Sequence, residues 1–234
     1  MPALPTVDFI CHDYGDAALL VDVLADSYDD RWSATQSLGQ ALRGAGLPGL
    51  VDVVASFQNV FVSFDPLVTC PEEIRLAITR LEDRPGPLRQ PSQFVIPVVY
   101  GGKYGPDLQS VAAELSMTTE SVIELHTSSA WIVRFIGPGG APMMDGPPMP
   151  SSVRRLAEPR AKVSSGSVAL SGQQSTIYAA ASPGGWRLIG RTPAALFNLD
   201  REPHVPYRAG DSVTFARIEP AQWSGWTQPL VEGR

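Results

Sequence analysis

Three side chains of this sequence could take part in acid–base or anion chemistry: His126, Arg160 and Arg191. His126 lies near the end of a predicted helix, and a helix C-terminus favours the charged imidazole, which could donate a proton or bind phosphate near neutral pH. The planar guanidinium of an arginine suits a carboxylate or a transferring phosphoryl group. The structural alternatives are a half-buried capping histidine, and arginines that pair with acids such as Asp200 or Glu158.

Six further residues could bind a substrate or a phosphate group through hydrogen bonds: Gly139, Gly140, Gln173, Gln174, Gly184 and Gly185. The first glycine pair lies in residues 137–146, a stretch so rich in Gly and Pro that we expect a binding loop or a mobile lid there, not regular structure. The second glycine pair could expose backbone N–H groups to an anion, or form a tight turn. The glutamines could bind an amide substrate, or lie on an exposed hairpin.

Composition argues against several other kinds of site and partner. The net charge is -6, the pI is about 5.0 and no Lys/Arg cluster appears, so we expect no nucleic-acid partner. No apolar segment approaches the roughly 20 residues that span a bilayer, and no basic stretch followed by an apolar run opens the sequence. Cys11 and Cys70 form no CxxC pair, and the histidines stand far apart. We expect a reduced, metal-free, cytoplasmic protein.

Residues 1–88 are predicted to form an α+β domain. Strand-like runs occupy residues 7–11, 17–23, 51–56 and 60–64. One helical pattern opens at a possible capping box of Ser33 and Gln36, and another opens near Pro71, a residue type that suits the first helical turn. The order strand, strand, helix, strand, strand, helix indicates an antiparallel sheet with both helices on one face.

The remainder of the chain has a different pattern. Residues 83–92 contain three prolines and a glycine, which is typical of a linker. Residues 89–220 show one long strand, two short helices and then short strands between Gly and Pro turns, which predicts a mainly-β barrel or sandwich. Residues 221–234 form a tail whose Trp223 and Trp226 are expected to pack on this chain or on a partner.

Four segments, in order along the chain, resemble motifs of one protein family. They are residues 15–21 (GDAALLV), 51–66 (VDVVASF followed by FDP), 96–108 (IPVVYGGKYGPDL) and 182–193 (SPGGWRLIGRTP). The two long blocks are specific motifs, whereas a short string such as FDP is weak. The chain is therefore similar to the family that comprises the B subunit of 5-oxoprolinase, allophanate hydrolase subunit 1 and KipI.

That resemblance implies a ferredoxin-like N-terminal domain and a cyclophilin-like β-barrel domain. It also implies one subunit of a two-subunit or larger ATP-dependent amide hydrolase, most simply one that opens 5-oxoproline to glutamate, and inactive by itself. The implied partner is a subunit-2 homologue, the counterpart of the C subunit of 5-oxoprolinase. ATP with Mg²⁺ is the implied cofactor, bound mainly by the partner subunits.

Residues 137–146 depart from the family pattern, because the glycine–proline frame is kept while its aromatic residues are missing. This departure leaves open a second hypothesis, a KipI-like regulatory protein that binds and inhibits a sensor histidine kinase. A peptidyl-prolyl isomerase would follow only from the shape of the barrel, and fold alone does not fix function.

Overall fold

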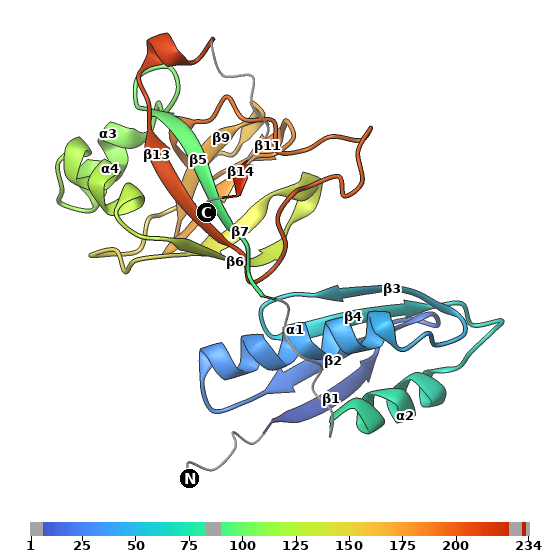
Figure 1. Ribbon diagram of the computed structural model, residues 1–234. Helices are drawn as coiled ribbons and strands as arrows, with labels where there is room; N and C mark the ends of the chain where they lie inside the picture. The colour runs from blue at the N-terminus through green and yellow to red at the C-terminus, as the bar shows by residue number, and fades with distance from the viewer. Residues whose placement is uncertain (1–6, 83–89, 225–230, 233–234) are drawn as a thin grey trace. The chain divides into compact units, whose positions relative to one another are not determined.

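The computed structural model describes residues 7–82, 90–224 and 231–232. The chain divides into two compact units, Met1–Gln90 and Pro91–Arg234 (Figure 1). The sequence predicts this boundary between residues 88 and 89, and most of the predicted linker lies outside the described residues. No helix within the described ranges is both long and apolar enough to cross a membrane.

The first unit is an antiparallel sheet with two helices. Its elements are β1 (Asp8–Asp13), β2 (Ala18–Leu24), α1 (Tyr28–Gly44), β3 (Leu50–Ala55), β4 (Asn59–Phe64) and α2 (Pro71–Glu82). The strand order is β1-β2-β4-β3, and every neighbouring pair is antiparallel. A ferredoxin-like unit runs β-α-β-β-α-β, whereas β1 here precedes β2 directly, so the ferredoxin-like arrangement stays a prediction.

Both helices pack on the same face of this sheet (Figure 1). Leu38 and Leu42 of α1, and Ile74 and Ile78 of α2, are spaced four residues apart, so each pair lies on one side of its helix. All four are buried with the inward side chains of the strands, among them Val62. This cluster is the core of the first unit.

Helix α1 begins earlier than the sequence pattern predicts. Ser27 is its N-cap, and the Oγ of Ser27 accepts a hydrogen bond from the backbone N–H of Asp30 at 3.1 Å. Asp29 and Asp30 lie in the first turn, where carboxylates favour the helix N-terminus. The predicted cap, Ser33, lies inside the helix. The sequence pattern placed the helix start too far along the chain because the polar first turn carries no apolar stripe.

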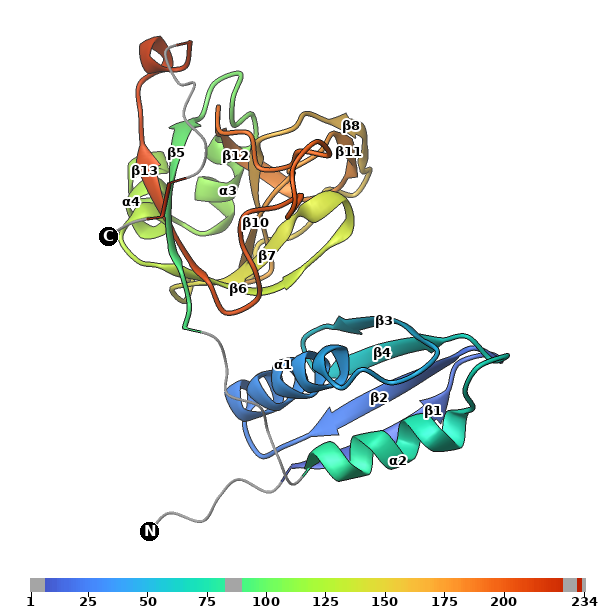
Figure 2. The same cartoon turned by 45° about the vertical axis from the view of Figure 1, so that its right-hand side comes forward.

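In the second unit, seven of the described strands close into a barrel (Figure 2). They are β5 (Gln93–Tyr100), β6 (Trp131–Ile136), β7 (Pro142–Asp145), β9 (Ser167–Ser171), β10 (Gln174–Ile177), β12 (Arg187–Arg191) and β13 (Ser212–Arg217). Their order is β12-β9-β10-β7-β6-β13-β5, and pairing between β12 and β5 closes the ring. The mainly-β barrel is as predicted, and its finer cyclophilin-like assignment stays a prediction.

Two helices, α3 (Leu108–Glu114) and α4 (Thr119–Thr127), pack against this barrel. Leu108 and Val111 of α3 and Val122 of α4 are buried in the barrel core with residues such as Ile96 and Phe215. A separate pair of strands, β8 (Arg160–Val163) and β11 (Ser182–Gly184), forms a small antiparallel sheet. This small sheet and the start of α3 position the candidate site below.

Residues 137–146 contain regular structure, so the sequence expectation for them was wrong. Residues 138–140 form a 3-10 turn, and residues 142–145 form β7, which pairs with both β6 and β10. Proline lacks an N–H and glycine weakens a strand. A proline is nevertheless tolerated at the first residue of a strand, and Pro142 occupies that position.

The C-terminal tail packs in part on its own chain. The ring of Trp223 lies 4.9 Å from the ring of Tyr104, measured between centroids. A short strand, β14 (Val231–Glu232), pairs with β5. Trp226, the other tryptophan of the tail, lies outside the described residues.

Candidate functional site

The small sheet of β8 and β11 brings together three of the predicted site residues. Arg160, the first residue of β8, lies opposite Gly184 of β11. Gly185 follows directly, and a Cβ at Gly185 would lie 3.5 Å from the side chain of Pro159 and 3.7 Å from the Nε of Arg155. The structure thus places two arginines beside the Gly184–Gly185 backbone, although these segments are well separated in sequence.

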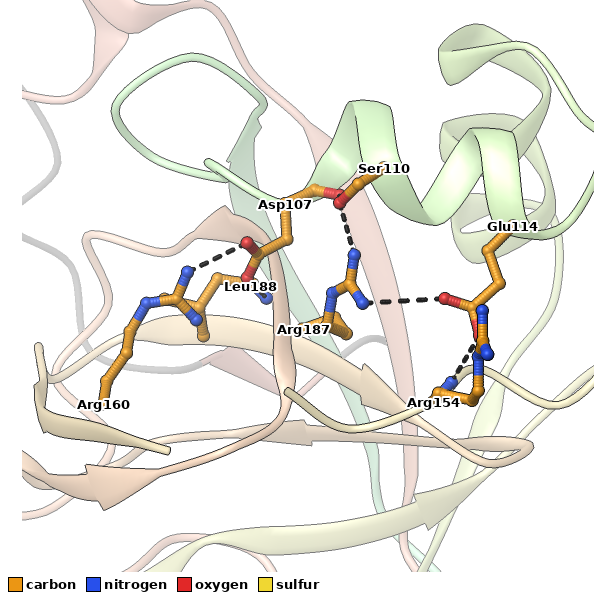
Figure 3. Close-up of polar contacts among 7 residues, drawn as sticks. All are labelled: Asp107, Ser110, Glu114, Arg154, Arg160, Arg187 and Leu188. Atoms are coloured by element: carbon orange, nitrogen blue, oxygen red, sulfur yellow. Dashed lines mark hydrogen bonds and ion pairs between the residues drawn. The ribbon is translucent and has the colours of Figure 1, made fainter. Parts of the chain in front are cut away.

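Asp107 holds Arg160 in place (Figure 3). One carboxylate oxygen of Asp107 accepts a hydrogen bond from the Nη2 of Arg160 at 2.9 Å, and the other accepts from the backbone N–H of Leu188 at 2.7 Å. Asp107 is buried and stands at the start of α3, yet its side chain does not cap that helix. The carboxylate therefore ties α3, β8 and β12 together around the guanidinium.

A third arginine, Arg187, lies next to Asp107 and Arg160 (Figure 3). Its guanidinium donates to the Oγ of Ser110 and lies 3.6 Å from a carboxylate oxygen of Glu114. Glu114 also accepts hydrogen bonds from Arg154, at 2.8 Å from the backbone N–H and 3.0 Å from Nε. These bonds, the backbone one above all, lower the pKa of Glu114 below its ordinary value.

Two nitrogens of these arginines have unsatisfied hydrogen-bonding capacity. The Nη1 of Arg160 and the Nε of Arg187 are buried and have no hydrogen-bond partner among the described residues. A buried donor without a partner is costly, and most such atoms in native proteins bind a group such as water or an ion. We call Arg155, Arg160 and Arg187, with Gly184 and Gly185, the arginine cluster.

Tyr178 forms one wall of the arginine cluster. A Cβ on Gly184 would collide with the phenol ring of Tyr178, so only glycine fits there. Burial raises the pKa of Tyr178, while a backbone hydrogen bond from Trp186 and the charges of Arg155 and Arg160 oppose that shift. The phenol stays neutral near pH 7 and remains able to donate a hydrogen bond. The arrangement is chemically suited to a small anion such as a carboxylate or phosphoryl group.

His126 lies elsewhere, inside the barrel. Its ring nitrogens are 2.8 Å from the hydroxyl of Tyr100 and 3.0 Å from that of Ser175, and its ring stacks on Phe215 at 4.1 Å between centroids. Burial lowers the pKa of His126 to about 3. The expectation that the helix C-terminus favours its charged form was therefore wrong, because a helix dipole contributes only about 0.3–2 kcal/mol, less than the cost of burying a charged group.

Arg191 occupies the opposite end of β12 from Arg187. Its Nε donates to the backbone carbonyl of Ser165 at 2.9 Å, and its guanidinium carbon lies 5.4 Å from the ring centroid of Trp223. Arg191 and the arginine cluster are thus at different ends of one strand. A catalytic role for Arg191 stays a prediction.

The glutamine pair uses its amide groups within the chain. Gln173 accepts from the backbone N–H of Met149 at 2.7 Å and donates to the carbonyl of Ser151 at 3.0 Å. Gln174 donates to Asp145 at 2.9 Å. The structure places neither glutamine in the arginine cluster.

Gly140 lies against the loop that joins β12 to β13, whereas Gly139 lies against Ala180, at 3.5 Å from a Cβ built on Gly139. A Cβ at Gly140 would lie 2.5 Å from Val205 and 3.2 Å from Phe197, so the backbone at Gly140 is in close contact with that loop.

Within the described residues, no group of three or more His, Cys, Asp and Glu side chains could hold a metal ion.

Sequence reasoning missed Asp107, Arg155, Tyr178 and Arg187 as members of the site. Two of them stand inside the motifs noted above, Asp107 in residues 96–108 and Arg187 in residues 182–193. Their position inside these motifs was therefore the sequence feature that could have identified Asp107 and Arg187. The motifs could not show that the two segments contact each other, because that contact depends on β12 lying beside α3.

The barrel and this cluster define the class of protein. Residues 9–207 match the carboxyltransferase domain, subdomain C and D, and the chain belongs to that family. Within it, the 5-oxoprolinase B subunit of Escherichia coli O157:H7 is 36% identical over 215 residues, covering 88% of this chain and 94% of that relative. The 5-oxoprolinase B subunit of Bacillus subtilis (strain 168) is 28% identical over 239 residues, covering 95% and 98%. The chain therefore belongs to the family of 5-oxoprolinase B subunits, as the sequence motifs predict.

Solved structures share the fold. The protein PH0987 from Pyrococcus horikoshii is 33% identical with a TM-score of 0.55, covering 92% of this chain and 100% of that one. TTHA0988 is 27% identical with a TM-score of 0.72, and this chain spans 40% of its length. The urea carboxylase of Kluyveromyces lactis has a TM-score of 0.74 at 16% identity, covering 93% of this chain and 22% of that one, which is a likeness of fold alone.

Proposed function

We propose that this chain is one component of a multi-subunit enzyme that uses ATP to hydrolyse a small amide, with 5-oxoproline as the substrate and glutamate as the product. The names of the curated relatives support this proposal. The proposed partner is a homologue of the C subunit of 5-oxoprolinase. ATP with Mg²⁺ is proposed to bind mainly on the partner subunits, and the chain alone is proposed to be inactive.

The arginine cluster carries the proposal. It presents two buried guanidinium nitrogens without partners among the described residues, beside two glycines whose backbone N–H groups could reach the same anion. ATP would supply the phosphoryl group that makes the amide carbonyl electrophilic. The guanidinium of Arg160 would then hold negative charge that develops during the transfer, and preorganised donors of this kind are often the largest contribution to catalysis.

The test is ATP hydrolysis by this chain purified together with its partner, with and without 5-oxoproline. Arg160→Ala removes the guanidinium, and we expect the 5-oxoproline-dependent rate to fall on the order of 100-fold, as for loss of one oxyanion-stabilising donor. Arg160→Lys keeps the positive charge but lacks the planar guanidinium, and we expect a smaller decrease in the 5-oxoproline-dependent rate. Equal rates from the lone chain and the complex would refute the proposal.

Arg208→Ala is the matched control, because Arg208 is exposed in the same unit and lies outside the cluster. Its rate should equal that of the unchanged complex. Arg160→Ala also leaves Asp107 without its ion pair, so thermal unfolding of each variant should be measured in parallel. A folded Arg160→Ala complex with full activity would show that the cluster does not serve the reaction.

A further inference from the structure

The sheet of the first unit has a second face that its two helices leave uncovered. Along β4, Val60 and Val62 point into the core that the strands share with α1 and α2. Successive side chains of a strand point to opposite faces, so Phe61 points away from the helices. The same alternation along β2 turns Leu20 to this second face. Both helices lie on the core side of the sheet (Figure 1).

Apolar side chains form a continuous row across the second face. The strand register places Leu20 opposite Phe61, and Phe61 opposite Val54. The ring of Tyr14 meets the ring of Phe61 edge to face, with 5.5 Å between the centroids. Tyr14 is 62% exposed, Val54 46% and Ile10, on the neighbouring strand β1, 44%. We call these five residues the apolar face, and an exposed patch of this kind is typical of a protein-binding surface.

The charged side chains of the first unit are divided between the two sides of the sheet. Strands β1 to β4 contain no lysine or arginine. All arginines of residues 7–82 lie on α1 and α2: Arg31, Arg43, Arg75 and Arg80. Asp22 of β2 and Asp52 of β3 each adjoin a strand residue that is buried in the core, so both carboxylates point to the same side as the apolar face. We call these two aspartates the acidic rim.

This division of charge decides which partner fits the apolar face. A two-fold dimer would place the same patch of two copies against each other, and Asp22 and Asp52 would then face further carboxylates, which is unfavourable. Nucleic acids carry negative charge and are disfavoured for the same reason. The complementary surface has an apolar centre with lysine or arginine around it, because these cations can pair with the acidic rim.

We propose that the apolar face and the acidic rim bind the partner subunit, through an apolar patch of that subunit flanked by lysine or arginine. This inference rests on the proposed function for the existence of the partner, and adds the surface of this chain that binds it. Phe61 and Tyr14 are the main contacts, because a few aromatic side chains supply much of the binding free energy in protein interfaces. The acidic rim speeds association and selects the partner.

The test is calorimetric titration of the full chain with the purified homologue of the C subunit, at low and at high salt. Tyr14→Ala and Phe61→Ala should each weaken binding by about 10-fold or more. Asp22→Lys should also weaken binding, with a larger effect at low salt, where charges are less screened. The matched controls lie on α2, where Leu76 is 51% exposed and the Glu72 side chain 77%. Leu76→Ala and Glu72→Lys should leave the affinity unchanged.

The possible outcomes separate this inference from the proposed function. Binding of the unchanged chain that stays equally tight in Tyr14→Ala and Phe61→Ala would overturn the inference alone. No binding of the unchanged chain would contradict the proposed partner, and the inference with it. A dimer of the lone chain that Phe61→Ala abolishes would place a second copy on the apolar face and overturn the inference. Thermal unfolding of each variant checks its fold, and Tyr14→Ala changes a largely exposed side chain.

Discussion

At the scale of single residues, burial decides what His126 can do. The ring is enclosed by Phe215 and Trp131, and both ring nitrogens face hydroxyl groups. Hydroxyls can donate or accept, so a neutral imidazole is satisfied in either tautomer. His126 therefore links α4 to the barrel strands as a neutral group.

This burial predicts a pH dependence of stability. The pKa of His126 is about 3 in the folded chain and about 6.5 in an unfolded one. Because folding lowers this pKa, the unfolded chain binds a proton at pH values where the folded chain does not. The free energy of unfolding is therefore highest above pH 6.5 and decreases as the pH falls towards 3, by up to about 1.4 kcal/mol per pH unit. Urea unfolding between pH 7 and 5.5 measures the slope.

His126→Gln removes the titrating group, and the slope over that window should become shallower. In NMR spectra of the unchanged chain, the ring signals of His126 should not move between pH 7.5 and 5. A ring that titrates near 6.5 in the folded chain would contradict the buried neutral state.

At the scale of elements, the site depends on how closely the segment before α3 approaches β12. Gly105 lies directly against this strand, and a Cβ there would collide with the carbonyl of Ile189 and lie 2.7 Å from the backbone nitrogen of Gly190. The backbone N–H of Asp107 donates to the carbonyl of Leu188 at 2.9 Å. Glycine at position 105 is therefore what lets Asp107 reach Leu188 and Arg160.

Gly105→Ala should push this segment away from β12 and lower the free energy of unfolding of the barrel unit by about 1–3 kcal/mol, the usual cost of overpacking. Gly185→Ala is the control, because its nearest neighbour would be at an ordinary 3.5 Å. We expect that control to change stability by less than about 1 kcal/mol. Equal unfolding midpoints for the two variants would show that the close approach is unimportant.

Element prediction succeeded where the apolar period was clear. The strands predicted at 17–23 and 60–64 lie within one residue of β2 and β4, and α2 begins at Pro71, where the sequence places the start of a helix. β7 and β11 were missed because both are short and contain a proline, and both lie in stretches of the chain that are rich in Gly and Pro. β7 becomes a strand through pairing with β6, which precedes it, and with β10, which follows later in the chain; β11 becomes a strand through pairing with β8.

At the scale of the whole molecule, the chain has separate cores for its two units. The buried cluster that contains Leu42 draws only on the first unit, and the cluster that contains Leu170 draws only on the second. Each unit therefore has its own source of hydrophobic stabilisation.

Leu42→Ala and Leu170→Ala form a matched pair, since both side chains are almost fully buried. Each should destabilise its own unit by about 2–5 kcal/mol. Amide hydrogen exchange in the intact chain should show lost protection only in the unit that carries the substitution. Equal loss in both units after Leu42→Ala would show that the units unfold together.

The sequence by itself determined the family, the order of an α+β unit before a β-rich one, and several strands, because motifs and apolar periods are local properties of a chain. It also pointed to Arg160, Gly184 and Gly185. Tertiary structure alone decided that these residues meet Asp107 and Arg187, and that His126 is neutral. Both outcomes depend on burial and on pairing between distant segments. The spacing of residues along the chain specifies neither the dielectric environment of a side chain nor its long-range contacts.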